Sequence, residues 1–216
     1  MVLLIPLFCG LGIWQLDRAE QKRQLAASVE SRRKLPPSSL NNGSIDANEL
    51  EFRKISADGR FLPDKTVLIE NRKHQGENGF HVITPLLLDD SQQVVLINRG
   101  WIPRQRLSET APLPTPTGRV RVNGVIAGLQ PPALELAFSD TESESPPHWP
   151  YLTLDHFAAW SGLEILPFNV LQSPDDENGF VREWPQPRFS DTMHIGYAIQ
   201  WFAFALITLV IWVRLS

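Results

Sequence analysis

A cluster of polar side chains stands at the start of the last apolar segment, 193–215, and comprises His194, Tyr197, Gln200 and Trp201. The segment carries no charged side chain until its penultimate residue. Burying an ionisable group at membrane depth costs free energy, so a histidine in this position is a candidate functional residue. Desolvation favours the neutral imidazole, which is the form that ligates metals. On a helix, His194, Tyr197 and Trp201 share one face.

Both ends of the chain have the character of membrane segments. A helix rises about 1.5 Å per residue, so 193–215 can cross the roughly 30 Å hydrocarbon layer of a bilayer. The opposite end, 1–16, is also apolar and has no charge before Asp17. It lacks the basic residues and the cleavage site of a signal peptide. We expect two transmembrane helices, 1–16 and 193–215, and the first is short enough to begin a few residues upstream. The alternative for 1–16 is a buried N-terminal helix.

The residues between these helices, 17–192, hold nearly all the charges and are numerous enough for one domain with its own core. Runs of β-forming residues predict strands at 51–61, 65–72, 80–88, 93–101, 119–128 and 165–171. Turn residues at 89–91 predict a hairpin, 154–163 predicts a short helix, and 130–150 predicts an exposed loop. The expected fold is mainly antiparallel β, in an α+β or barrel-like domain.

The composition argues against several functional classes. A net charge of -4 does not favour nucleic-acid binding. Cys9 is the single cysteine, which excludes an intrachain disulfide and a CxxC site. The histidines of the middle domain, His74, His81, His148 and His156, lack metal-ligand spacing. No phosphate-binding loop, HExxH or GxSxG occurs, and no nucleophile–base–acid set is legible, so an enzyme is disfavoured.

Four motifs together resemble the Surfeit locus protein 1 family. They are Gly12–Arg18 (GIWQLDR), Asn71-Arg72 followed by Gly76, Gly79 and 82–86 (VITPL), Val94–Pro103 (VVLINRGWIP) and His194–Phe202 (HIGYAIQWF). Each motif alone is weak. The four occur in the family's order and spacing, and they extend over the whole chain with an apolar segment at each end.

This resemblance implies an assembly factor for haem-copper cytochrome c oxidase that assists delivery or insertion of haem A into the catalytic subunit. The expected partners are cytochrome c oxidase subunit I and the lipid bilayer, with haem A synthase as a further candidate. The implied location is the bacterial inner membrane, with two spans and the main domain in the periplasm. His194 is expected to be an axial ligand of the haem iron, and Tyr197 and Trp201 are expected to stack on the porphyrin edge.

Other interpretations of the same residues remain open. In a haem-free scaffold, which would hold the oxidase subunit during cofactor loading, His194 would cap its helix at the membrane interface. The small residues Ala198 and Ala205 leave room for a flat macrocycle, or else they pack on Gly10 and Gly12 of the first helix.

The two Asn-Arg pairs of the domain carry a further hypothesis. Arg72 and Arg99 each follow an asparagine at the end of a predicted strand. A pair of arginines at one rim would bind haem propionates or a carboxylate of a partner.

Overall fold

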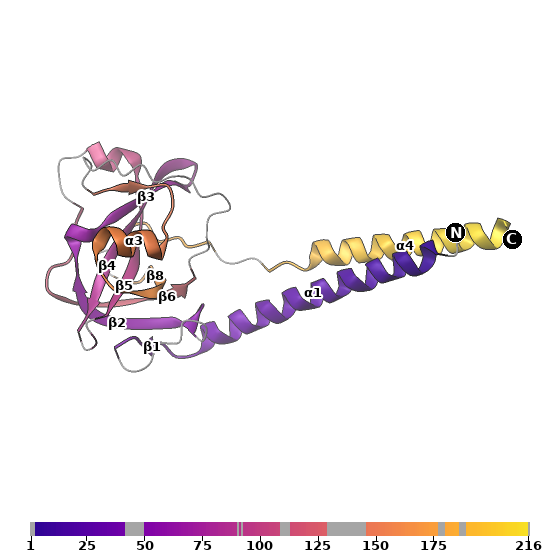
Figure 1. Cartoon of the computed structure of the whole chain (residues 1–216), viewed down its shortest axis with the longest axis horizontal. Coiled ribbons are helices and arrows are strands. Elements are labelled where there is room, and N and C mark those ends of the chain that lie inside the picture. The colour runs from indigo at the N-terminus through magenta and orange to yellow at the C-terminus, as the bar shows by residue number, and fades with distance from the viewer. Residues whose placement is uncertain are drawn as a thin grey trace. The chain divides into compact units, whose positions relative to one another are not determined.

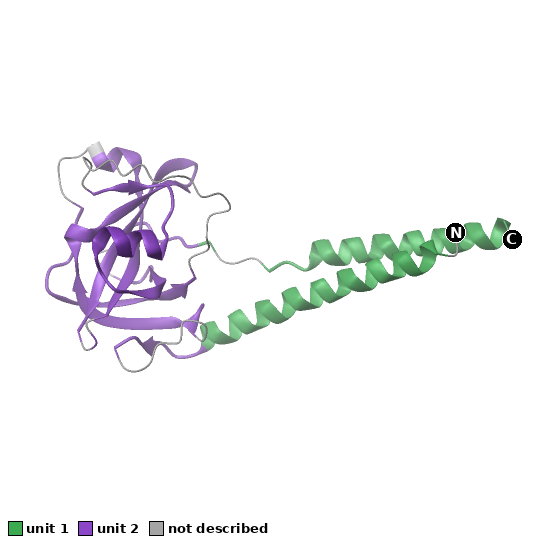
Figure 2. Cartoon of the chain, in the orientation of Figure 1, with its two compact units in different colours: residues 1–34, 185–216 green, residues 35–184 purple. Residues whose placement is uncertain are grey.

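The computed structural model describes residues 3–41, 50–89, 91, 93–108, 113–128, 146–176, 180–185 and 189–215. The chain divides into two compact units, drawn in different colours in Figure 2. One unit contains residues 1–34 and 185–216, and the other contains 35–184. The predicted limits 1–16, 17–192 and 193–215 follow the change from apolar to charged sequence. The two units of the structure instead follow which residues pack against one another. The charged residues 17–34 therefore fall in the same unit as both ends of the chain.

The first unit is a pair of helices, α1 (Leu4–Lys34) and α4 (Thr192–Leu215), which run side by side in opposite directions (Figure 1). Of the described helices, α4 alone is long and apolar enough to cross a membrane. The first predicted span, 1–16, is the apolar beginning of α1, and this helix continues without a break into charged sequence. Ala, Gln, Glu, Lys and Arg propagate it, and two prolines end it just beyond Lys34.

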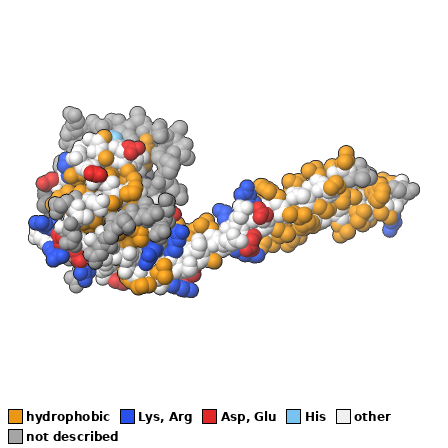
Figure 3. Space-filling model, turned by 60° about the horizontal axis from the view of Figure 1, so that its bottom comes forward, with side chains coloured by type: hydrophobic (Ala, Val, Ile, Leu, Met, Phe, Trp, Pro, Cys, Tyr) orange, Lys and Arg blue, Asp and Glu red, His pale blue; other side chains and the backbone are white. Residues whose placement is uncertain are grey.

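Exposed hydrophobic side chains gather over α4 and over the apolar beginning of α1 (Figure 3). They include Leu7 and Ile13 on α1, and Ile199, Leu206 and Val213 on α4. Large apolar side chains exposed along a whole helix favour a lipid environment over water.

The second unit is built around one mixed sheet. Its strands are β1 (Ser38–Ser39), β2 (Lys54–Phe61), β3 (Val67–His74), β4 (Glu77–Leu88), β5 (Val94–Pro103), β6 (Arg119–Ala127), β7 (His148–Trp149) and β8 (Ile165–Gln172). Two 3₁₀ turns, η1 (Pro63–Lys65) and η2 (Arg104–Ser108), and the helix α3 (Leu154–Ser161) complete the elements described. The six longer strands confirm the strands predicted from sequence, including the hairpin of β4 and β5.

Five of the strands close into a barrel, in the order β2, β6, β8, β5 and β4, with β4 returning to β2. All these neighbours are antiparallel except β5 and β8, so the prediction of a mainly antiparallel, barrel-like domain is confirmed. Closure occurs where residues 59–61 of β2 pair with 86–88 of β4. A Cβ atom on Gly59 would lie 2.3 Å from the backbone oxygen of Leu87, so only glycine allows this approach of the two strands.

The barrel interior is filled by side chains that alternate along its strands. This core comprises Leu40, Ile55, Ala57, Phe61, Leu86, Leu88, Val95, Ile97, Val122, Ile126, Leu166, Phe168 and Val170. A second cluster, which includes Ile69, Leu96 and Phe157, lies between the sheet and α3. The helix α3 confirms the short helix predicted at 154–163: Thr153 caps it by accepting from the backbone N–H of His156, and Gly162 ends it in a left-handed conformation.

The predicted exposed loop, 130–150, lies mostly outside the described residues, but its last part contradicts the prediction. Trp149 is only 2% exposed. Its ring packs edge to face against Phe157 and Trp160, and β7 pairs in parallel with β3. The aromatic contacts with α3 override the polar, proline-rich local sequence that predicted an exposed loop.

Candidate functional site

Small residues allow α1 and α4 to pack closely. Ala19 of α1 and Ala198 and Ala205 of α4 are buried in the seam between the helices. Gly12 faces the ring of Phe202, which would lie 2.7 Å from a Cβ atom at that position. Of the two interpretations of Ala198 and Ala205, room for a flat macrocycle or packing on the first helix, the structure shows helix packing, because α1 occupies the space beside them. Gly10 makes no such contact with the described part of α4, because a Cβ atom there would meet nothing within 4 Å outside its own helix backbone.

His194, in the first turn of α4, is held by Gln15 of α1. Its Nδ1 atom lies 2.8 Å from Gln15 Oε1. With this oxygen as the acceptor, the imidazole proton is on Nδ1 and the lone pair of the neutral ring is on Nε2. This arrangement resembles metal-binding histidines, in which a hydrogen bond to one ring nitrogen orients the other nitrogen toward the metal. His194 is half-buried, so α1 covers one side of the ring and leaves another side accessible.

The structure separates the two aromatic residues that accompany His194 in the predicted site. Trp201 lies on the side facing α1, where its ring stacks on Phe8 at 5.8 Å between centroids. Tyr197 is 51% exposed and lies away from the seam. Trp201 is therefore part of the helix packing, whereas Tyr197 is free to contact a molecule outside the helix pair.

An ion pair flanks the His194–Gln15 contact on the polar side of the helix pair. Arg23 Nε donates to Asp191 Oδ2 at 2.6 Å, and the backbone oxygen of Asp191 accepts from Ile195 N in the first turn of α4. The contact ties α1 to the chain just before α4 begins. Sequence inspection missed both this pair and the role of Gln15. The only available signal for Gln15 was its place in the GIWQLDR motif.

The Asn-Arg-Gly-Trp motif of β5 holds the barrel together, and Arg99 is not at a rim. Its side chain is 0% exposed and lies between the rings of Phe61 and Phe180, 5.0 Å from each centroid. The guanidinium donates to Thr115 Oγ1 at 2.8 Å and to the backbone oxygen of Pro114 at 2.7 Å. Burial and the neighbouring Arg182 lower the pKa of Arg99 to about 10. The hypothesis that Arg99 pairs with Arg72 to bind a ligand is therefore wrong.

Gly100 and Trp101, the rest of this motif, lie where the segment after β8 pairs with the end of β5. Gly100 has φ +126°, and a Cβ atom there would lie 2.8 Å from the backbone oxygen of Val181. Trp101 and Val181 exchange two backbone hydrogen bonds, of 2.7 and 3.1 Å. Glycine thus permits the segment after β8 to pair with the end of β5.

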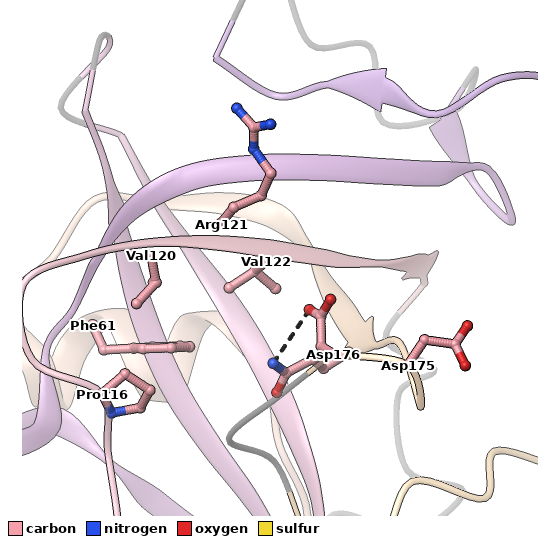
Figure 4. A pocket seen from close by; sticks show the side chains of 8 residues that line it. Phe61, Pro116, Val120, Arg121, Val122, Asp175 and Asp176 are labelled. Carbon is pink, nitrogen blue, oxygen red and sulfur yellow. Dashed lines mark hydrogen bonds between the residues drawn. The ribbon is translucent and has the colours of Figure 1, made fainter.

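A pocket opens at one end of the barrel (Figure 4). It is lined by Phe61, Pro116, Val120, Arg121, Val122, Gln172, Asp175 and Asp176. Asp176 accepts from the backbone N and the side-chain Nδ2 of Asn123, at 2.7 and 2.8 Å. Arg121 points away from the apolar side and makes two bonds of 2.8 Å to Asp58, which hold the pKa of that carboxyl below its usual range. These charged groups serve to join β2, β6 and the turn after β8.

Among the described residues, no group of three or more His, Cys, Asp or Glu side chains is placed to hold a metal ion. A metal-containing ligand at His194 would therefore bring its other coordinating atoms with it, as a porphyrin does. The donor chemistry and partial exposure of His194 would fit it to hold the iron of such a group through Nε2.

Comparison with known proteins places the chain among relatives of one kind. The model of the SURF1 family matches residues 2–206. A SURF1-like protein from Monosiga brevicollis is 27% identical, over 95% of this chain and 82% of its own length. Surfeit locus protein 1 of Mus musculus is 26% identical, over 98% of this chain and 73% of its own. Cytochrome oxidase assembly protein SHY1 of Saccharomyces cerevisiae is 33% identical over 100 residues, which is 45% of this chain and 26% of that protein.

Proposed function

This chain belongs to the SURF1 family, and on that premise we propose that it assists cytochrome c oxidase assembly by delivering haem A to, or inserting it into, the catalytic subunit. The name of the yeast relative, a cytochrome oxidase assembly protein, supports the assembly role. The family match over nearly the whole chain supports a shared architecture. In this proposal the protein is not an enzyme, and haem A is a cargo that it carries transiently.

One observation carries the haem part of the proposal: the hydrogen bond that orients the His194 ring. Gln15 holds Nδ1 at 2.8 Å, which leaves Nε2 of the neutral ring as the ligating atom. Haem A, when bound, supplies the iron that accepts this nitrogen.

The other residues of the helix pair have supporting roles in this proposal. Gln15 and the helix seam fix the position of the imidazole. Tyr197 lies one turn further along α4 and away from the seam, where its ring can lie along the edge of the macrocycle. Trp201 is engaged with Phe8, so its role is to hold the helix pair together beneath the site.

We further propose a location and partners. Helix α4 crosses the inner membrane, and α1 enters the membrane beside it, so both ends of the chain lie on one side. The barrel domain lies in the periplasm and contacts cytochrome c oxidase subunit I. Haem A synthase, as the source of the cargo, is the second expected partner.

The first test is an absorption spectrum of the chain purified in detergent from membranes of cells that make haem A. The wild type and a His74→Ala control, altered at a histidine of the barrel domain, are expected to show the same Soret band. The His194→Ala variant is expected to lose it. Retention of the full band in this variant would contradict ligation by His194.

A haem-free scaffold is the second candidate function. The packing of α1 over Ala198 and Ala205 favours it, because the space that a macrocycle would need beside these alanines is filled. The same purification distinguishes the two candidates. The scaffold predicts no Soret band in any variant, while oxidase assembly still depends on the protein and tolerates His194→Ala.

A further inference from the structure

One face of the sheet carries a group of aromatic and basic side chains that the proposed function does not use. Trp101 extends from β5 across β4, and its Nε1 donates to the backbone oxygen of Arg72 on β3 at 2.7 Å. Gly79 makes this crossing possible, because a Cβ atom there would lie 2.6 Å from the indole ring. His74 lies against the same indole, with 5.0 Å between ring centroids. The face is thus bounded by β3, β4 and β5.

His81 of β4 lies beside this indole, and its tautomer is set by a chain of hydrogen bonds. The backbone N–H of Gly100 donates to Asn98 Oδ1 at 3.3 Å, which directs the Asn98 amide nitrogen toward His81. Asn98 Nδ2 then donates to His81 Nδ1, also at 3.3 Å. Because Nδ1 accepts, the proton of the neutral ring is on Nε2. Burial, together with the charge of Arg72, lowers the pKa of His81 to about 4, so at pH 7 the ring is a neutral N–H donor.

Arg72 is half-buried, and its surroundings differ from those of several other arginines of the domain. Arg104, Arg119 and Arg121 each lie within 4 Å of a carboxylate, and Arg99 binds a hydroxyl and a carbonyl. Within the described ranges, the Arg72 guanidinium has no acceptor, and its Nε is shielded from solvent without a partner. Burial lowers the pKa of Arg72, but the group keeps its charge at neutral pH. A half-buried cation without a counter-charge has lost part of its hydration, so an anion that binds it recovers part of that cost.

We propose that Arg72 and His81 form a binding site for a carboxylate carried on a flat apolar body. In the pairing of β3 with β4, Arg72 lies opposite Gly79 and His81 lies opposite Ile69, so the two donors are near neighbours on adjacent strands. A guanidinium binds both oxygens of a carboxylate, and an imidazole N–H adds a third donor. The site is independent of His194, because it uses only residues of the barrel domain.

The apolar body is inferred from the rings around the two donors. Trp184 meets His81 edge to face at 5.5 Å, and His74 covers part of Trp101. Glu183 lies 3.9 Å from His74 Nδ1 and is largely exposed, so it faces His74 rather than the two donors. Indole and imidazole surfaces beside a cation favour an aromatic carboxylate over a compact, strongly hydrated anion such as phosphate.

The test is a titration of the full chain in detergent with benzoate, acetate and inorganic phosphate, followed through the ¹⁵N resonances of the His81 ring at pH 7. Benzoate is expected to shift the Nε2 resonance saturably and to bind more tightly than acetate or phosphate. Arg72→Gln is expected to weaken benzoate binding by about tenfold or more. Lys73→Gln makes the same charge change at the neighbouring, exposed position of β3 and is expected to leave binding unchanged.

Three results would overturn the proposal: no saturable shift in the wild type, equal benzoate binding in Arg72→Gln, or phosphate binding as tight as that of benzoate. Arg72→Lys is a second variant in case the glutamine variant does not fold. It retains the charge but loses the two-pronged contact, and a weakened affinity for benzoate is expected. His194→Ala should bind benzoate normally, so a failure of the haem proposal leaves this test intact.

Discussion

At the scale of single residues, the two histidines that matter most owe their properties to one neutral amide each. Gln15 fixes the tautomer of His194 with the proton on Nδ1, whereas Asn98 fixes that of His81 with the proton on Nε2. Opposite chemical roles follow. In the two proposals, His194 presents a lone pair to the haem iron, and His81 presents an N–H donor to an anion.

Gln15 can be tested separately from His194. We expect Gln15→Leu to weaken haem binding by about tenfold to a hundredfold, because partners of this kind hold a ligating histidine in its orientation and tautomer. Titration of the apoprotein with haem, followed by the Soret band, measures the change. Gln21→Leu, at an exposed position of the same helix, is the matched control. Equal affinities in the two variants would contradict the role assigned to Gln15.

The burial of His81 predicts a dependence of stability on pH. The folded state holds its pKa at about 4, and unfolding returns it to about 6.5, so the unfolded chain binds more protons between these values. The free energy of unfolding therefore does not depend on His81 protonation above about pH 6.5. Lowering the pH to 4 reduces the free energy of unfolding by about 3 kcal/mol, because the unfolded chain takes up a proton that the folded ring does not. Urea unfolding at pH 7.5 and pH 5 should show a smaller loss of stability in His81→Gln than in the wild type. The same loss in both proteins would refute the assignment.

At the scale of elements, barrel closure depends on one position where two strands nearly touch. Gly59→Ala would place a Cβ atom 2.3 Å from the Leu87 backbone oxygen, which cannot move without displacing β4. We expect a loss of about 1–3 kcal/mol in the free energy of unfolding, measured by urea denaturation. Gly10→Ala, where no described atom lies within 4 Å of the added carbon, should not destabilise the chain. Similar stabilities for the two variants would contradict this account of closure.

Local sequence pattern predicted the longer strands and α3 but not the contacts that join them. Runs such as Val94–Ile97 predict a strand because they are rich in β-branched, apolar residues, which favour buried strands. The closure at Gly59, the burial of Trp149 and the pairing of Gln15 with His194 join residues far apart in the sequence. Arg99 illustrates the same limit. Its charge predicts a place at the surface, but two aromatic rings and a carbonyl from distant segments enclose it.

At the scale of the whole molecule, the chain consists of two units with separate interiors. Every residue of the three core clusters lies within 35–184, so a fragment with these limits is expected to fold without detergent. Its near-ultraviolet circular dichroism and urea midpoint should match those of the barrel domain in the full chain. A fragment that lacks a cooperative transition would show that the barrel requires the helices.

The order of the elements along the chain has a consequence in time. Residues 35–191 separate the end of α1 from the start of α4, which is 157 residues. At synthesis rates of about 5–20 residues per second, α1 leaves the ribosome roughly 8–30 s before its partner. During this interval the seam that holds Gly12, Gln15 and Ala19 has no α4 to cover it. The side of newly made α1 that faces the seam therefore stays uncovered during this interval, and the contact between Gln15 and His194 forms only when the last helix is made.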